Sequence, residues 1–320
     1  MIRTDVGTFD PGRVCDSGQI FRMYRTKGPA SFDIAAESGT GENEKWFTVY
    51  SADRRLAISQ EGTQVRLWCD ERDYEEYWKH YLDMDRDYES LRRRIDKKDA
   101  FLTRAAEAGR GLRILNQDLF ETIISFIISQ QKQIPSIRKC IEALCERFGE
   151  KHLCEGQGNR DDHWYGFPRP EVLAAAGEDG LKGLSLGYRE RYIHETSVLF
   201  LEKERELRQS VESKRHDETK KILLSFTGIG EKVADCIGLF ACENPDAFPV
   251  DTHIISIMER EYPVRYGTDE GAAGAMSGEK KKMNPGRARA RVQEVFGRYK
   301  GFEGLVQQWI FAYEINRRIE

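Results

Sequence analysis

The chain has 320 residues, of which 39% are hydrophobic and 32% are charged, and its formal net charge is -4. These values predict a soluble globular protein of two or three packed units, and they exclude a protein that binds nucleic acid through a uniformly basic surface. No apolar run approaches the roughly 18 to 20 residues of a membrane-spanning helix, and the N-terminus lacks the apolar core of a signal sequence. We therefore expect a cytoplasmic protein, nucleoid-associated if it is prokaryotic, with no membrane partner.

The first hundred residues carry the strand signals. Residues 46–50 and 64–68 are rich in β-branched and aromatic side chains, and residues 64–68 alternate polar with apolar. Glycine-containing turns at 38–41 and 61–62 separate such segments. This pattern predicts an antiparallel sheet of several short strands with one face covered.

Helical spacing begins near Asp73 and dominates the rest of the chain. Asp118 and Glu121 resemble a capping box ahead of the apolar run 122–128, which predicts a buried central helix. Further helices are expected at 137–148, 170–176, 190–207, 216–226, 231–242, 252–260, 288–299 and 302–319, and loops at 154–162 and 267–286. The order predicts an α+β, mostly helical protein, with an antiparallel β domain over 1–100 and a helical region over 101–320.

The seven cysteines give no sign of a metal or disulfide framework. Their number is odd, their spacings are irregular, and no Cys-x-x-Cys pair occurs. No cysteine follows Cys242, so the four-cysteine C-terminal cluster that would hold an iron–sulfur centre is absent.

Two glycines separated by one residue, Gly228 and Gly230, lie between the predicted helices 216–226 and 231–242. Glycine permits positive φ and close approach of another backbone. The free N–H groups at the start of the second helix can bind a phosphate, directly or through a bridging cation. A tight helix–helix turn without a ligand is the alternative interpretation.

A lysine and an aspartate follow this turn. Lys232 lies in the first turn of a predicted helix, where the helix dipole disfavours a positive charge. To act as a nucleophile it must lose a proton, and burial and the helix N-terminus would both lower its pKa from about 10.4. Asp251 precedes the next helix and is a predicted N-cap, whose fixed carboxylate can stabilise positive charge on a sugar. The alternatives are a solvated surface lysine and a purely structural cap.

These motifs resemble the helix-hairpin-helix DNA glycosylase superfamily, specifically its 8-oxoguanine DNA glycosylase branch. The resemblance is carried by Gly-Ile-Gly-Glu-Lys-Val-Ala-Asp-Cys at 228–236 and Pro-Val-Asp-Thr-His at 249–253. Further segments agree in order along the chain, namely 17–22, 165–168, 186–189, and Gln307 with Phe311. The resemblance implies a β domain related to the TATA-binding protein fold and two helical bundles, with the helix-hairpin-helix at about 216–242 at the mouth of an active-site cleft.

The resemblance also implies a base-excision-repair glycosylase with AP (abasic-site) lyase activity. Such an enzyme excises 8-oxoguanine from duplex DNA through a lysine Schiff base and β-elimination, with Lys232 as the nucleophile and Asp251 as its electrostatic partner. The residues implied at the base are Gly18, whose carbonyl reads N7–H, Gln307 at the Watson–Crick edge, and Cys236 and Phe311 on the two faces. The residues implied at the DNA are Gly228, Gly230, Val233, His253, Tyr188 as the wedge, Arg189 at the orphaned cytosine, Gln131 and Lys132.

One segment departs from the branch pattern and leaves the opposite-base preference open. Where the branch has asparagines followed by an arginine, this chain has Gln131, Lys132, Gln133 and Ser136. The adjacent pair Gln130–Gln131 resembles the alkylated-base branch. The alternatives are therefore the same fold and mechanism on an alkylated purine, or a non-catalytic helix-hairpin-helix DNA-binding module.

The expected partner is damaged duplex DNA, bound by a monomer. The chemistry needs no metal or organic cofactor, and a structural cation at the Gly228–Gly230 hairpin is the one candidate metal. Basic side chains that could contact DNA include Lys220, Arg289 and the cluster 280–282.

Overall fold

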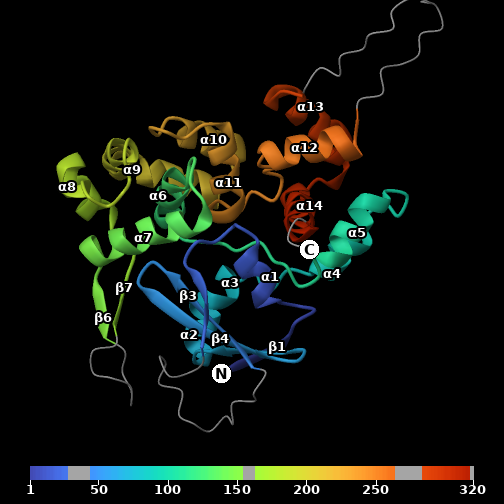
Figure 1. Ribbon diagram of the computed structural model, residues 1–320, viewed down its shortest axis with the longest axis horizontal. Helices are drawn as coiled ribbons and strands as arrows, with labels where there is room; N and C mark the ends of the chain where they lie inside the picture. Colours follow the sequence, from blue (N-terminus) through green and yellow to red (C-terminus); the bar gives the residue numbers. More distant parts are fainter. Residues whose placement is uncertain (28–43, 154–162, 264–282, 318–320) are drawn as a thin grey trace, which may run out of the picture.

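The computed structural model describes residues 1–27, 44–153, 163–263 and 283–317 (Figure 1). Five strands form one antiparallel sheet in the order β1–β5–β4–β3–β2. Their bounds are β1 Ile2–Asp5, β2 Met23–Thr26, β3 Lys45–Ser51, β4 Arg54–Glu61 and β5 Gln64–Trp68. The two strands predicted from β-branched and aromatic content are confirmed as β3 and β5.

The sheet is covered more fully than expected. In the register of β3 with β4, Phe47 pairs with Ile58 and Val49 pairs with Leu56, and all four side chains are buried. Trp46 points to the opposite face because successive residues of a strand alternate, yet it is also buried and stacks on a second tryptophan, Trp68. The expectation of a single covered face is therefore wrong for the central strands.

The helical region begins at residue 71. Its elements are α2 Glu71–Asp73, the π-helical turn η2 Tyr74–Trp78, α3 Lys79–Tyr81, α4 Tyr88–Arg93, α5 Ala100–Ala108, α6 Leu119–Ser129, α7 Ile134–Phe148, β6 Lys151–Leu153, β7 His163–Tyr165, α8 Pro170–Leu181, α9 Arg189–Glu212, α10 His216–Leu224, α11 Glu231–Ala241, α12 Thr252–Glu261, α13 Pro285–Phe296, the 3₁₀ turn η3 Gly297–Tyr299 and α14 Glu303–Arg317. Gly177, at φ 64°, breaks α8 where the sequence predicts its end. The predicted loops fall almost wholly outside the described residues.

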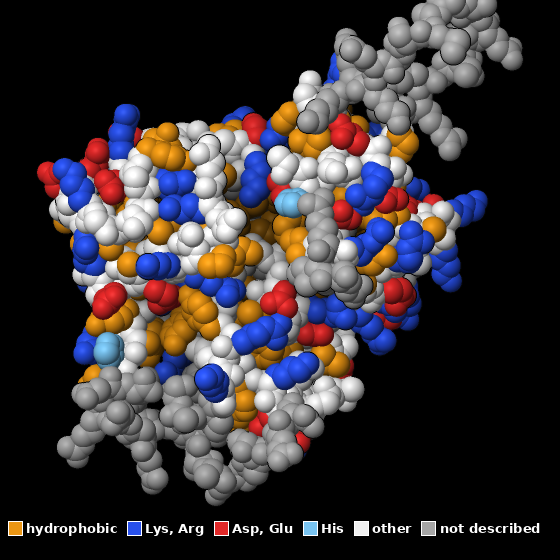
Figure 2. All heavy atoms as spheres, in the orientation of Figure 1, with side chains coloured by type: hydrophobic (Ala, Val, Ile, Leu, Met, Phe, Trp, Pro, Cys, Tyr) orange, Lys and Arg blue, Asp and Glu red, His pale blue; other side chains and the backbone are white. Residues whose placement is uncertain are grey.

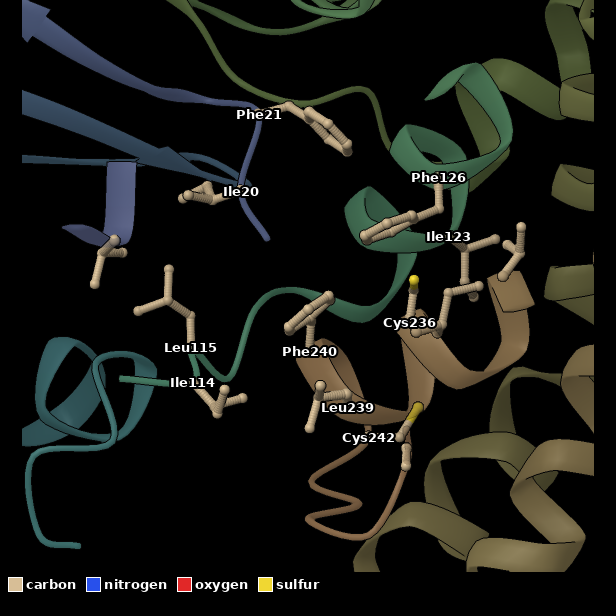
Figure 3. Packing of buried hydrophobic residues seen from close by; sticks show 14 of the residues in the cluster. Ile20, Phe21, Ile114, Leu115, Ile123, Phe126, Cys236, Leu239, Phe240 and Cys242 are labelled. Atoms are coloured by element: carbon tan, nitrogen blue, oxygen red, sulfur yellow. The ribbon is translucent and has the colours of Figure 1, made fainter. Parts of the chain in front are cut away.

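The helices form two groups, with α6 to α11 gathered apart from α12 to α14, α4 and α5 (Figure 1). Helix α11 packs on α6 and α10, and α14 packs on α5. In the shared core, Phe126 of α6 stacks on Phe240 of α11, while Phe21 from the β domain meets the edge of Phe126 (Figure 3). The α+β, mostly helical architecture is confirmed. None of the described helices is long and apolar enough to cross a membrane.

The start of α6 joins the sheet to the helices. Asp118 caps α6 by accepting the N–H of Glu121 at 2.8 Å, as predicted. The Glu121 carboxylate does not return to Asp118, as it would in a capping box. It accepts the N–H of Ala52, in the turn between β3 and β4, at 2.7 Å and lies 3.8 Å from the Arg22 guanidinium. Burial raises the pKa of Glu121 to about 7.

Candidate functional site

The turn between α10 and α11 contains two glycines, and its geometry requires glycine at Gly228 but not at Gly230. Gly228 has φ +81°, and a Cβ added there would lie 2.5 Å from Cδ2 of Tyr192. Gly230 has extended backbone, is exposed, and has open space where a Cβ would be. As the N-cap of α11 it has no side chain to accept the first N–H groups of the helix. Val233, in the same first turn, is buried.

Lys220 spans the two helices of this motif. Its Nζ lies 2.8 Å from a carboxylate oxygen of Glu231 and 2.7 Å from one of Asp235. The lysine is therefore paired with two carboxylates of α11 in the free protein, and its contact with DNA stays a prediction. The cluster 280–282 lies outside the described residues. Lys and Arg side chains are interspersed with acidic ones over the visible face (Figure 2).

Lys232 lies on α11 one turn before Cys236, and its Nζ is 5.6 Å from the centroid of the Phe126 ring. The pKa of Lys232 is raised, first by the neighbouring Cys236 sulfur and then by the negative charge of Asp251, against the opposing effect of burial. Burial in turn raises the pKa of the Cys236 thiol to about 11. The expectation of a lowered lysine pKa is therefore wrong for the free protein, in which Lys232 is an ammonium at neutral pH.

Asp251 is the N-cap of α12, as predicted. Its side chain accepts the N–H of Ile254 at 2.8 Å. This bond fixes the carboxylate at the end of the helix whose first turn also carries His253. The negative charge of Asp251 on α12 raises the pKa of Lys232 on α11, so the two side chains lie within electrostatic reach of each other.

A second group of predicted residues assembles beside the first. Gly18 has φ +74°, and a Cβ added there would lie 3.5 Å from the ring of Phe311. The Phe311 ring in turn meets His253, with centroids 5.9 Å apart and nearly perpendicular planes. Gln307 lies one turn earlier on α14, is buried, and accepts a hydrogen bond from Gln308 at 2.9 Å. Two ends of the chain thus meet at the first turn of α12.

The wedge and cytosine candidates lie at the N-terminus of α9. Tyr188 is 48% exposed, with its ring edge-on to Tyr192. Arg189 is only 6% exposed. Its guanidinium lies over the Tyr188 ring and donates to the carbonyls of Leu186 and Gln130. A cytosine contact by Arg189 therefore requires these internal bonds to be exchanged.

The segment around Gln131, which differs from the branch pattern, bonds to the turn before α9 and to the hairpin. Gln131 is exposed and has φ 52°, and the ammonium of Lys132 donates to the carbonyl of Ser185 at 2.9 Å. Gln130, the first residue of the glutamine pair, donates from its amide to the carbonyl of Gly228 at 2.8 Å. This bond links the segment around Gln131, which differs from the branch pattern, to the Gly228–Gly230 hairpin. The sequence indicates Gln130 only as part of the glutamine pair and does not predict its bond to the hairpin.

No group of three or more His, Cys, Asp or Glu side chains in the described part of the chain could hold a metal ion. A cation at the Gly228–Gly230 hairpin would be bound by backbone groups, and it stays a prediction.

Family models match most of the chain in two consecutive parts. Residues 1–123 match 8-oxoguanine DNA glycosylase, N-terminal domain, and residues 124–273 match the HhH-GPD superfamily of base excision DNA repair proteins. The N-glycosylase/DNA lyase of Saccharomyces cerevisiae is 29% identical over 222 residues, which are 64% of this chain and 57% of that protein. A probable N-glycosylase/DNA lyase of Methanothermobacter thermautotrophicus is 28% identical over 276 residues, which are 76% of this chain and 86% of that protein. The chain thus spans little more than half of the yeast relative.

A solved structure agrees over nearly the whole fold. It is the 8-oxoguanine glycosylase/lyase of Clostridium acetobutylicum in complex with double-stranded DNA containing cytosine opposite 8-oxoG. The two chains share 28% identity with a TM-score of 0.78, and the match covers 97% of this chain and 93% of the other.

Proposed function

This chain belongs to the 8-oxoguanine DNA glycosylase branch of the helix-hairpin-helix base-excision repair superfamily, and from that premise we propose that it is a bifunctional glycosylase and AP lyase that excises 8-oxoguanine from duplex DNA. The observation that carries the proposal is that Lys232, in the first turn of α11, lies within electrostatic reach of Asp251, which is fixed as the cap of α12. A module that only binds DNA needs neither an amine nucleophile nor a carboxylate beside it.

The enzyme binds the DNA backbone at two helix N-termini. The first is the hairpin start of α11, with Gly228, Gly230 and Val233, and the second is the start of α12, with His253. Helix N-termini favour anions because their N–H groups are free and the helix dipole is positive there. The exposed Tyr188 enters the duplex when the lesion is extruded. Gln131 and Lys132 face the space that the extruded base leaves in the stack. Extrusion costs a few kcal/mol, and least at a damaged pair.

Recognition of the base uses the group around Phe311. The extruded base lies between Phe311 and Cys236, its N7–H donates to the carbonyl of Gly18, and its Watson–Crick edge meets Gln307. The closeness of the Gly18 turn to Phe311, at which an added Cβ would reach the ring, supports this arrangement because it puts the Gly18 backbone beside the aromatic wall.

The chemistry begins with neutral Lys232. Its Nζ forms a bond to C1′ as the C1′–N bond to the base breaks and the base departs with that electron pair, taking up a proton. The Asp251 carboxylate stabilises the positive character that develops on the sugar. The sugar ring then opens to a Schiff base, and loss of a proton from C2′ breaks the C3′–O bond, which cuts the strand 3′ to the lesion. Because Lys232 is an ammonium in the free protein, its proton must leave before attack.

A lesion panel tests the proposal. Duplexes carrying 8-oxoguanine, an alkylated purine or undamaged guanine, each opposite cytosine, are incubated with the protein and analysed with and without alkali to separate base loss from strand cleavage. We expect release of 8-oxoguanine with strand cleavage that does not need alkali. Release of the alkylated purine with retention of 8-oxoguanine would instead support the alkylated-base alternative that Gln131 suggests, and would remove the roles given to Gly18 and Gln307.

A further inference from the structure

A chain segment outside the predicted site joins the Gly18 turn to the helix that carries Lys232. This segment, residues 113–117, runs between the β-domain stretch of Ile20 and Phe21 and helix α11 (Figure 3). At its end, the backbone N–H of Gln117 donates to the carbonyl of Phe240 at 2.7 Å, in the last turn of α11. The side-chain amide of the same residue donates to the carbonyl of Gln19 at 2.8 Å. Gln117 thus bonds to α11 through its backbone N–H and to Gln19, the residue after Gly18, through its side-chain amide.

Gln19 completes the link from the other side. Its side chain is fully buried, and its amide oxygen accepts the N–H of Leu115 at 2.9 Å while its amide nitrogen donates to the carbonyl of Arg113 at 2.8 Å. Displacing a buried amide whose oxygen and nitrogen are both hydrogen-bonded costs free energy, because it leaves buried polar groups unpaired. The backbone at Gln19 is therefore fixed both through its side chain and through its carbonyl.

These bonds determine where the Gly18 carbonyl points. The Gly18 carbonyl and the Gln19 N–H belong to one planar trans peptide, so they point in opposite directions. The Gln19 N–H lies 3.4 Å from the hydroxyl oxygen of Ser17, and that hydroxyl donates to the carbonyl of Val14 at 2.7 Å. Fixing Gln19 at its N–H, its carbonyl and its side chain thus fixes the orientation of the carbonyl that precedes it.

We infer that Gln117, acting with Gln19, is a positioning residue for lesion recognition, which holds the Gly18 carbonyl in register with the nucleophile helix. The inference rests on the proposed function, in which that carbonyl accepts the N7–H of 8-oxoguanine. Neither glutamine touches the sugar or Lys232. Loss of the link weakens base recognition, whereas it leaves the lysine, Asp251 and the hairpin in place.

The two activities of the enzyme separate this role from a general structural one. A preformed abasic site has no base to recognise, so its cleavage needs Lys232 but not the Gly18 carbonyl. We compare single-turnover excision of 8-oxoguanine with cleavage of a preformed abasic site in the wild type and in Gln117→Met, which keeps the size of the side chain and removes its donor. Asn116→Leu is the matched control, because the Asn116 amide also donates to a backbone carbonyl, that of His80 at 2.9 Å, but not to the Gly18 turn.

Gln117→Met is expected to lower the excision rate about five- to tenfold, the range for loss of one hydrogen bond, with abasic-site cleavage changed less than about twofold. Asn116→Leu is expected to leave the ratio of the two rates at its wild-type value. An unchanged ratio in Gln117→Met, or an equal fall of both rates, overturns the inference, and Gln117→Ala replaces the methionine variant if that variant does not fold. Failure of the proposed function is distinguishable, because the wild type itself would then not excise 8-oxoguanine, whether or not it cuts abasic DNA.

Discussion

Asp251 accepts the backbone N–H of Ile254 at 2.8 Å, so the carboxylate that acts on Lys232 is also the structural cap of α12. The two roles can be separated by substitution, because asparagine caps a helix about as well as aspartate but carries no charge. We expect Asp251→Asn to keep the wild-type unfolding midpoint and to lower the excision rate about 100-fold, the usual effect of removing one preorganised electrostatic group.

Asp251→Ala provides the comparison. It removes the cap as well as the charge, so we expect the same loss of activity together with a loss of about 1 kcal/mol in the free energy of unfolding. Thermal unfolding and single-turnover excision of both variants are the measurements. An asparagine variant that excises at the wild-type rate would make Asp251 a cap and nothing more.

The raised pKa of Lys232 predicts how activity depends on pH. Only the neutral amine attacks, and below its pKa the neutral fraction grows about tenfold for each pH unit. Cleavage of a preformed abasic site should therefore rise from neutral to mildly alkaline pH. Asp251→Asn removes the negative charge that helps to hold the proton on Lys232, so the pH profile of this variant should shift to lower pH. The abasic substrate is used because its cleavage does not depend on recognition of a base. A flat wild-type profile would show that deprotonation of Lys232 is not limiting.

The two hairpin glycines should differ in their tolerance of a side chain. Gly228→Ala forces φ +81° on a residue with a Cβ and drives that Cβ into the ring of Tyr192. We expect it to lower the free energy of unfolding by about 1–3 kcal/mol. Gly230→Ser introduces a favourable N-cap in open space and should be neutral or slightly stabilising. Urea unfolding of the pair provides the measurement, and equal stability of the two variants would contradict this description of the hairpin.

Much of the site could be predicted because its signals are local. The Asp251 cap follows from the residue type directly before an apolar helical run. The hairpin follows from two glycines between helical patterns, and the buried helix α6 from an apolar run with a cap. Each depends on a few consecutive residues, so the chain itself carries the information.

Other features depend on contacts between distant residues and could not be predicted in this way. Strand β2, Met-Tyr-Arg-Thr, is only four residues long and pairs with β3, whose partner residues lie twenty or more positions away in sequence. The carboxylate of Glu121 accepts the N–H of Ala52 instead of bonding to the start of its own helix. The guanidinium of Arg189 donates to the carbonyls of Leu186 and Gln130. The pKa of Lys232 depends on its neighbours Cys236 and Asp251 as well as on burial, and Asp251 belongs to another helix, so the residues around Lys232 in sequence do not predict the direction of the shift.

Borohydride trapping on a duplex with 8-oxoguanine opposite cytosine tests the central claim most directly, because reduction converts a lysine Schiff base into a stable protein–DNA bond. The wild type should give a covalent adduct, and peptide mapping should place it on Lys232. Lys232→Gln should give none while still binding the duplex. No adduct with the wild type, or an undiminished adduct with Lys232→Gln, would contradict the assignment of Lys232 as the nucleophile.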